Sequence, residues 1–247
     1  MLITPPEMLN LELPDLGISM TEPEPIKLLN HGSIRLVESM GSDLSIVRAA
    51  RNSYDAAWRT GEDEGKDAKL LDYLVKNYHT SPLESVTLTF EVHLPIFVAR
   101  QWMRHRTWAY AEVSGRYSEL PEVYYVPEIS AITAQSVANK QQRTDEVLPT
   151  AEAIQSMLVD QCAEAFKVYK ALLAKGCPRE LARGVLPLNT FTRFFCTVNL
   201  LNLAKFIKLR SHAHAQMEIR VYSDAMLELV KTVAPVTMAA VERHWLT

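Results

Sequence analysis

The stretch SVTLTFEVHLPIFVARQWMRHR, residues 85–106, decides the fold. Its first half alternates apolar and polar side chains, the pattern of a strand with one buried face. The apolar positions are Val86, Leu88, Phe90, Val92 and Leu94. Pro95 suits the first turn of a helix, and we expect that helix to cover residues 95–106. Its last turn then carries Arg104, His105 and Arg106.

The segments on either side predict a few strands among long helices. Residues 26–39 indicate one or two strands, and residues 192–200 indicate another. Apolar residues at helical spacing predict four helices: one containing Leu70, Leu71, Leu74 and Val75 and ending near His79; one over 150–176, capped by Gly176, with Ile154, Met157, Leu158, Ala165, Val168, Leu172 and Leu173 on its apolar side; one over 199–211; and one over 214–232, closed by Pro235. This mixture predicts one α+β domain over residues 27–247.

Residues 1–26 differ from the rest of the chain. They hold five of the thirteen prolines and little periodicity, so we expect an extended N-terminal arm without chemistry of its own. They also lack the basic and apolar regions of a signal peptide, and no stretch reaches the roughly 18 apolar residues of a membrane span. Three widely spaced cysteines with no CxxC pair fit a reducing compartment. We therefore expect a cytoplasmic protein with no membrane partner.

The charge balance and the missing motifs exclude several classes of function. A formal net charge of −3 is unlike the basic balance of a general nucleic-acid binder. The chain has no GxG, so the dinucleotide-binding fingerprint is absent, and no GxSxG surrounds a serine. His212 and His214 flank one alanine, but no nearby pattern completes a zinc site, and we expect no metal.

Three polar clusters remain as candidate sites, and the third places Arg183, Asn199 and Arg210 in apolar helix or strand contexts. HTSPLE places His79, Ser81 and Glu84 just before the strand that begins near Val86, and a simple helix stop followed by a turn is the competing interpretation. The segment RHRTWAYAEVSGRY, residues 104–117, gathers cations whose competing role is to interact with a helix C-terminus. A helix end does not require the Ser114-Gly115-Arg116 sequence that follows. A hydroxyl, a closely approaching backbone and a guanidinium are the parts of a phosphate clamp, so the segment predicts a phosphorylated ligand.

These blocks, with ARGVLPLNTFTRFF and LRSHAHAQMEI in the same order, resemble the flavin-dependent thymidylate synthases (the ThyX family) over about residues 45–232. The resemblance implies an antiparallel sheet flanked by long helices, and a homotetramer with sites shared between subunits. It also implies that dUMP becomes dTMP with 5,10-methylenetetrahydrofolate as carbon donor and NADPH as reductant through FAD.

The resemblance further assigns residues to ligands. The FAD-binding set would be His79, Ser81, Arg104, His105, Arg106, Glu112 and Asn199, with His79 near the flavin and the folate. The dUMP-binding set would be Gln101, Arg104, Glu112, Ser114, Gly115, Arg116, Arg183 and Arg210. Arg210 would be the catalytic residue that activates the uracil ring. The chain departs from the common family pattern at Ala111, Leu201 and Lys205, where polar residues are frequent.

Two alternatives stay open at this point. One is another flavin or folate enzyme that acts on a modified pyrimidine, such as a hydroxymethylating enzyme. The other is an RNA- or nucleotide-binding module, suggested by the cations and aromatic residues that alternate through this region: Arg104, Trp108, Tyr110, Arg116 and Tyr117.

Overall fold

Strand β3 (Thr87–Pro95) lies at the centre of the sheet, as its alternating pattern predicts. In the computed structural model, which describes residues 23–246, its inward side chains and the preceding Val86 are 0% exposed. The sheet has five strands in the order β1-β2-β3-β7-β4, and every neighbouring pair is antiparallel. The expectation of an α+β fold with an antiparallel sheet is confirmed.

The other strands are β1 (Ile26–Leu28), β2 (Gly32–Met40), β4 (Ala109–Glu112), β5 (Thr133–Gln135), β6 (Arg143–Val147) and β7 (Phe191–Asn199). The α-helices are α1 (Asp43–Asn52), α2 (Glu64–Lys76), α3 (Ile96–Trp102), α4 (Ala151–Ala174), α5 (Arg179–Ala182), α6 (Leu200–Arg210), α7 (Met217–Lys231) and α8 (Pro235–Trp245). Short 3-10 helices are η1 (Ala57–Arg59), η2 (Ser81–Ser85), η3 (Ile129–Ala131) and η4 (Arg183–Val185). The longest connection between these elements joins β4, which ends at Glu112, to η3, which begins at Ile129.

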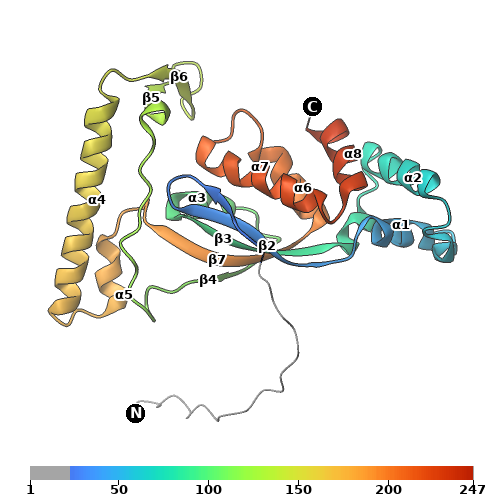
Figure 1. Ribbon diagram of the computed structural model, residues 1–247, viewed down its shortest axis with the longest axis horizontal. Coiled ribbons are helices and arrows are strands. Elements are labelled where there is room, and N and C mark those ends of the chain that lie inside the picture. The colour runs from blue at the N-terminus through green and yellow to red at the C-terminus, as the bar shows by residue number, and fades with distance from the viewer. Residues whose placement is uncertain (1–22, 247) are drawn as a thin grey trace, which may run out of the picture.

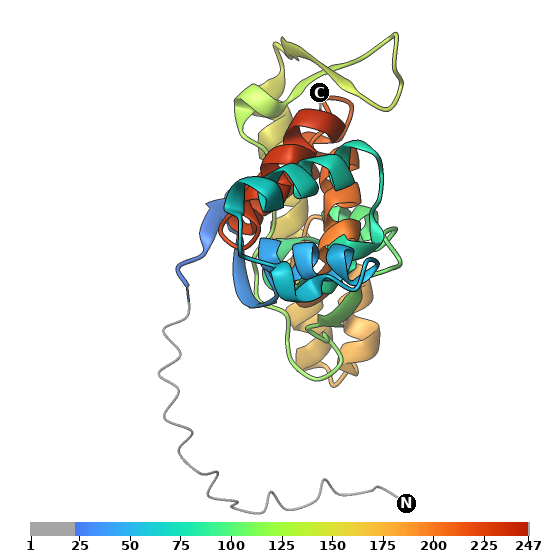
Figure 2. The ribbon, with the colours of Figure 1, turned by 90° about the vertical axis from the view of Figure 1, so that its right-hand side faces the viewer.

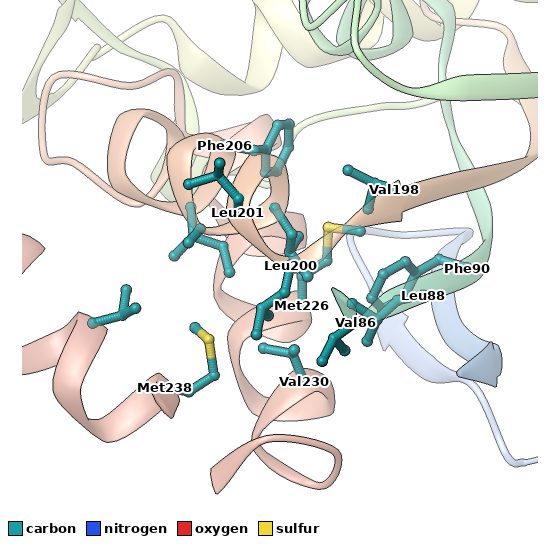
Figure 3. Packing of buried hydrophobic residues seen from close by; sticks show 14 of the residues in the cluster. Val86, Leu88, Phe90, Val198, Leu200, Leu201, Phe206, Met226, Val230 and Met238 are labelled. Carbon is teal, nitrogen blue, oxygen red and sulfur yellow. The ribbon is translucent and has the colours of Figure 1, made fainter. Parts of the chain in front are cut away.

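Helices α6 and α7 cover one face of the sheet, and α1, α2 and α8 gather at one end of it (Figure 1; Figure 2). The core lies between the sheet and these helices. Figure 3 shows Leu88 and Phe90 of β3 together with Leu200 of α6 and Met226 of α7. Among the described residues, no helix covers the opposite face of β3 and β7 (Figure 1).

Helix α4 stands at the other end of the sheet with α5 beside it (Figure 1). The predicted helix over 150–176 is confirmed, and Gly176 ends it at φ +81°. The predicted apolar side is only partly right, because Met157 and Val168 are 70% and 39% exposed. The face that packs inward is instead centred on Phe166 and Tyr169, one helical turn apart.

The predicted helix over 95–106 is too long at both ends. Pro95 closes β3 and serves as the N-cap of α3, which ends at Trp102. The hydroxyl of Tyr110 donates to the carbonyl oxygens of Trp102 and His105, at 3.3 and 3.2 Å, and so binds two of the acceptors at this chain reversal. Arg104, His105 and Arg106 therefore lie in the turn after the helix.

Helix α8 is absent from the elements that the sequence predicted, although Pro235 suits a first helical turn. The carboxylate of Asp43, at the start of α1, accepts hydrogen bonds from the backbone N–H groups of Val236 and Thr237, both at 2.9 Å. The hydroxyl of Thr237 donates to the same carboxylate at 2.5 Å. A cap supplied by a residue 193 positions away leaves no local sequence signal.

Candidate functional site

A pocket of about 340 Å³ opens where β4 ends beside the loop before β7. Four residues of the predicted dUMP-binding set line it: Glu112, Ser114, Gly115 and Arg183. The rest of the lining is mainly apolar and comes from Ile96, Val113, Leu120, Leu186, Pro187, Leu188, Phe191 and Thr192. The pocket can therefore hold an anionic group among polar side chains and an apolar body beside it.

Gly115 lies where an added side chain would crowd its neighbours. A Cβ built there lies 3.0 Å from Cδ1 of Leu120 and 3.3 Å from Cδ of Arg183. Leu120 is held in place by its backbone N–H, which donates to the hydroxyl of Tyr169 in α4 at 3.1 Å. Helix α4 thus fixes one wall of the pocket, and Gly115 lets the stem of Arg183 pass close to the backbone.

Glu112 is oriented by a residue that the sequence did not single out. The hydroxyl of Thr192 in β7 donates to Oε1 of Glu112 at 2.6 Å. Thr192 is 5% exposed, so this hydrogen bond comes from a rigid strand position. The sequence signal was weak, because Thr192 is one of several polar residues in the strand sequence FTRFFCTVN.

Arg116 points away from this pocket in the single chain. Its Nε lies 3.5 Å from the carboxylate of Glu180, and its side chain is 56% exposed. Its backbone N–H donates to Oγ of Ser114 at 3.3 Å, which holds the turn but leaves the guanidinium free to move. The predicted clamp of three consecutive residues is therefore only partly assembled here, with Ser114 and Gly115 in the pocket.

Arg210, Gln101 and His105 form a second group, and none of the three lines this pocket. Nε of Arg210 donates to Nε2 of His105 at 3.1 Å, and an Nη nitrogen donates to the carbonyl oxygen of Gln101 at 3.1 Å. The side-chain amide of Gln101 donates to Gln216, a second residue that sequence analysis did not assign. Gln216 lies in the quoted block LRSHAHAQMEI, which was the available signal.

Burial affects the protonation states of His105 and Arg210 in this second group. Burial, with a smaller contribution from the nearby Arg210, lowers the pKa of His105 to about 4. A neutral imidazole is also what an acceptor of the Arg210 hydrogen bond requires. Burial lowers the pKa of Arg210 from its ordinary value, but a guanidinium stays charged in proteins. The group presents one fixed positive charge.

Arg104 and Arg106 flank His105 on the turn after α3, and both are exposed. Within residues 23–246 neither guanidinium has a hydrogen-bond or ion-pair partner, whereas His105 between them packs edge-on against Phe206. This alternation leaves two free cations at a rigid turn. Their chemistry fits a pyrophosphate.

The remaining predicted residues lie near the start of α6. Asn199 is the N-cap of α6, and its side chain accepts from the backbone N–H of Asn202 at 2.9 Å. Ser81 begins η2, which packs against α6, and His79 precedes it with its ring edge-on to Tyr73. His79 and Ser81 are exposed. One chain thus holds the predicted residues in several groups rather than in a single pocket.

The three departures from the family pattern have different surroundings. Leu201 is 5% exposed and belongs to the core, while Ala111 and Lys205 are exposed. A buried leucine offers no polar contact to a cofactor.

The aromatic residues that suggested RNA binding are largely in the core. Trp108 is 6% exposed and packs on Trp102, and Tyr110 packs edge-on against Phe194. Of the aromatic residues in this segment, only Tyr117 is widely exposed, at 82%. A platform of stacked bases needs several exposed rings. The RNA-binding alternative loses its main support.

Within residues 23–246, no group of three or more His, Cys, Asp or Glu side chains is placed to hold a metal ion. In the same range, the helices are too short or too polar to cross a membrane.

Comparisons with known proteins give a consistent result. The family model described as thymidylate synthase complementing protein (Thy1) matches residues 35–236. The chain is 48% identical over 220 residues to the flavin-dependent thymidylate synthase of Treponema denticola, covering 88% of this chain and 82% of that protein. Identity to the enzyme of the same name from Thermus thermophilus is 47% over 227 residues, covering 92% and 82%.

The fold has a close match among solved structures. A UMP/dUMP methylase, PolB from Streptomyces cacaoi, bound with 5-Br dUMP, superimposes with a TM-score of 0.81 at 32% identity. The match covers 90% of this chain and 99% of that one.

Proposed function

This chain belongs to the family of flavin-dependent thymidylate synthases, and we propose that the pocket at the end of β4 holds the phosphate of its dUMP substrate. Its activity is the methylation of dUMP to dTMP, with 5,10-methylenetetrahydrofolate as carbon donor and NADPH as reductant through FAD. The observation that carries the proposal is the convergence of Ser114, Gly115 and Arg183 on one pocket.

In this proposal, Ser114 and Arg183 donate to the phosphate, and the close backbone approach at Gly115 makes room for it. Glu112, held by Thr192, accepts a hydrogen bond from the nucleotide or from FAD. Arg116 completes the clamp by exchanging its exposed contact with Glu180 for the phosphate. Gln101 contributes from the neighbouring group around Arg210.

We place Arg210 on the uracil ring. Its guanidinium is half buried and held by His105 and by the carbonyl of Gln101, so it needs little rearrangement to stabilise negative charge that develops on the ring. Arg104 belongs to both the FAD-binding set and the dUMP-binding set, and in this proposal it contacts both ligands. A protein nucleophile is not required, since the bound flavin supplies hydride chemistry.

The FAD site in this proposal uses the exposed cations Arg104 and Arg106 for the pyrophosphate. His105, neutral and packed on Phe206, holds the turn that carries them. Ser81 and Asn199 lie where η2 meets α6, and His79 precedes them beside the flavin and the folate. The residues fit the cofactor because the guanidinium groups of Arg104 and Arg106 stand at one turn and have no partner within residues 23–246.

We further propose a homotetramer with sites shared between subunits. A bare sheet face, on which Phe195 is 42% exposed, and exposed apolar residues at the α4–α5 end support it: Met157 at 70%, Leu181 at 66% and Leu188 at 66%. The separate groups of predicted site residues in one chain are a second support.

Light scattering should give a tetramer, and Arg106→Ala should lose FAD while remaining tetrameric. A monomer with stoichiometric FAD contradicts shared sites.

The proposal also includes the setting of the enzyme. We place it in the cytoplasm, without nucleic-acid or membrane partners, with residues 1–26 as an N-terminal arm and 27–247 as one catalytic domain. The arm lies almost wholly outside the described residues. Three free cysteines fit a reducing compartment.

One assay tests the function directly. Purified protein should be yellow, and NADPH should reduce its flavin anaerobically, faster with dUMP present. Addition of methylenetetrahydrofolate should then yield dTMP. Protein without flavin, or without dTMP formation in the complete mixture, contradicts the proposal.

The same assay should also be run with UMP as a second substrate, because the solved relative is named a UMP/dUMP methylase. UMP should replace dUMP in parallel reactions, with 5-methyl-UMP as the product sought. Formation of a hydroxymethylated pyrimidine in either reaction would favour the alternative enzyme class.

A further inference from the structure

Helices α2 and α4 end with the same pair of backbone hydrogen bonds. At the end of α4, the N–H of Cys177 donates to the carbonyl of Leu172 at 3.0 Å, and that of Gly176 to Leu173 at 2.9 Å. This is the Schellman motif, whose next-to-last residue is left-handed and is most often glycine. Gly176 meets that requirement with φ +81°.

At the end of α2 a tyrosine occupies the same position. The N–H of His79 donates to the carbonyl of Leu74 at 2.9 Å, and that of Tyr78 to Val75 at 3.2 Å. Tyr78 has φ +56°, in the left-handed region that a residue with a bulky side chain rarely adopts. Such a conformation persists only where the surrounding structure holds it.

Trp245, in the last turn of α8, contacts both parts of this motif. Its ring stacks on the ring of Tyr78, with centroids 5.3 Å apart and planes within 8° of parallel. Its indole N–H donates to the carbonyl of Val75 at 3.0 Å, the same carbonyl that accepts from Tyr78. Trp245 is only 5% exposed. The ammonium of Lys208 lies 5.9 Å from the Tyr78 ring and adds a weaker contact.

The conformation of Tyr78 decides where His79 lies. With Tyr78 left-handed, the chain turns out of α2, and the His79 ring rests edge-on against Tyr73 at 5.5 Å. With Tyr78 in an ordinary helical conformation, α2 would continue and carry His79 round its axis. The Schellman motif therefore sets the direction of the His79 side chain.

We infer that Trp245 is a positioning residue that holds His79 and Ser81 for their ligands by locking Tyr78 in the left-handed conformation. Trp245 lies beyond residues 35–236, which the family model matches. The inference rests on the proposed function, because it uses the placement of His79 and Ser81 beside the flavin.

The test compares Trp245→Ala, Trp245→Phe, Tyr78→Gly and the double variant Trp245→Ala/Tyr78→Gly. The first readout is FAD affinity, measured by fluorescence quenching. The second is hydrogen exchange at the His79 amide in protein without cofactor, measured by fragmentation mass spectrometry. Trp245→Ala should weaken FAD binding at least fivefold and speed His79 exchange at least tenfold. Trp245→Phe, which keeps a ring to stack, should stay within about twofold of wild type in both.

The double variant separates positioning from general packing. Glycine adopts the left-handed conformation without support, so Tyr78→Gly should restore both readouts to within about threefold of wild type despite the missing indole. If the double variant stays as impaired as Trp245→Ala, or if Trp245→Ala behaves as wild type, the inference is wrong. Should Trp245→Ala not fold, Trp245→Leu takes its place in the same comparison, with the same expected outcomes.

The two readouts also distinguish this inference from the proposed function. Wild-type protein that binds no FAD contradicts the proposed function, while His79 exchange still tests whether Trp245 fixes the motif. Wild-type protein that binds FAD, combined with unchanged exchange in Trp245→Ala, leaves the function standing and overturns the inference.

Discussion

Nε of Arg210 donates a hydrogen bond to Nε2 of His105, 3.1 Å away, and only a neutral imidazole can accept it. The pKa of His105 is lowered to about 4 by burial and by Arg210. The pair therefore keeps a single positive charge on Arg210 at neutral pH. This relationship leads to the first two predictions.

Folding stability should fall as the pH is lowered from about 6.5 to about 4. In that window the unfolded chain protonates His105, whereas the folded chain resists until near its pKa of about 4. His105→Gln should reduce the slope of unfolding free energy against pH by up to about 1.4 kcal/mol per unit. Urea unfolding at several pH values measures this. His212→Gln, at an exposed position, is the control and should leave the slope nearly unchanged.

Arg210→Ala should lower turnover at saturating dUMP at least about a hundredfold, near 2.7 kcal/mol of transition-state stabilisation. Flavin reduction by NADPH without dUMP should change little, because the uracil ring takes no part in it. Arg193→Ala removes an exposed cation, 60% exposed on the other face of the sheet, and should retain turnover. Turnover within threefold of wild type for Arg210→Ala contradicts its assignment.

Gly115→Ala should raise the dUMP dissociation constant about tenfold, equivalent to about 1.4 kcal/mol. The added Cβ would lie 3.0 Å from Leu120 and 3.3 Å from Arg183, so the pocket wall must shift. Gly184→Ala is the matched control, because its Cβ meets no atom within 4 Å although it adjoins Arg183. Calorimetric titration measures both variants. Equal affinities would show that the wall yields without cost.

Asp43→Ala should lower the free energy of unfolding by about 1–2 kcal/mol, because it removes the cap of α8. Three hydrogen bonds from Val236 and Thr237 lose their acceptor together. Asp145→Ala, on the exposed β6 strand, should change stability by less than about 0.5 kcal/mol. Chemical denaturation compares the two. A similar small effect for Asp43→Ala would mean that α8 needs no cap.

The family blocks in the sequence predicted which residues bind the ligands, but not how these residues are grouped in one folded chain. Glu112, Ser114, Gly115 and Arg183 share a pocket, while Arg210 with Gln101 and His105 lies in another group. Thr192 and Gln216 were missed because their roles come from contacts across 80 and 115 positions of sequence. Such contacts have no local pattern.

The sequence by itself determined the elements whose cause is local. Alternation placed β3, and glycine after a long amphipathic run ended α4 at Gly176. Only the tertiary structure decided where α3 stops, because the hydroxyl of Tyr110 in β4 donates hydrogen bonds to the carbonyl oxygens of Trp102 and His105. It also decided that α8 forms on the carboxylate of Asp43, and that Tyr78 turns left-handed beneath Trp245. In each case a group distant in sequence supplies the hydrogen bond or ring contact that local residues lack, so the deciding free energy exists only once the chain has folded.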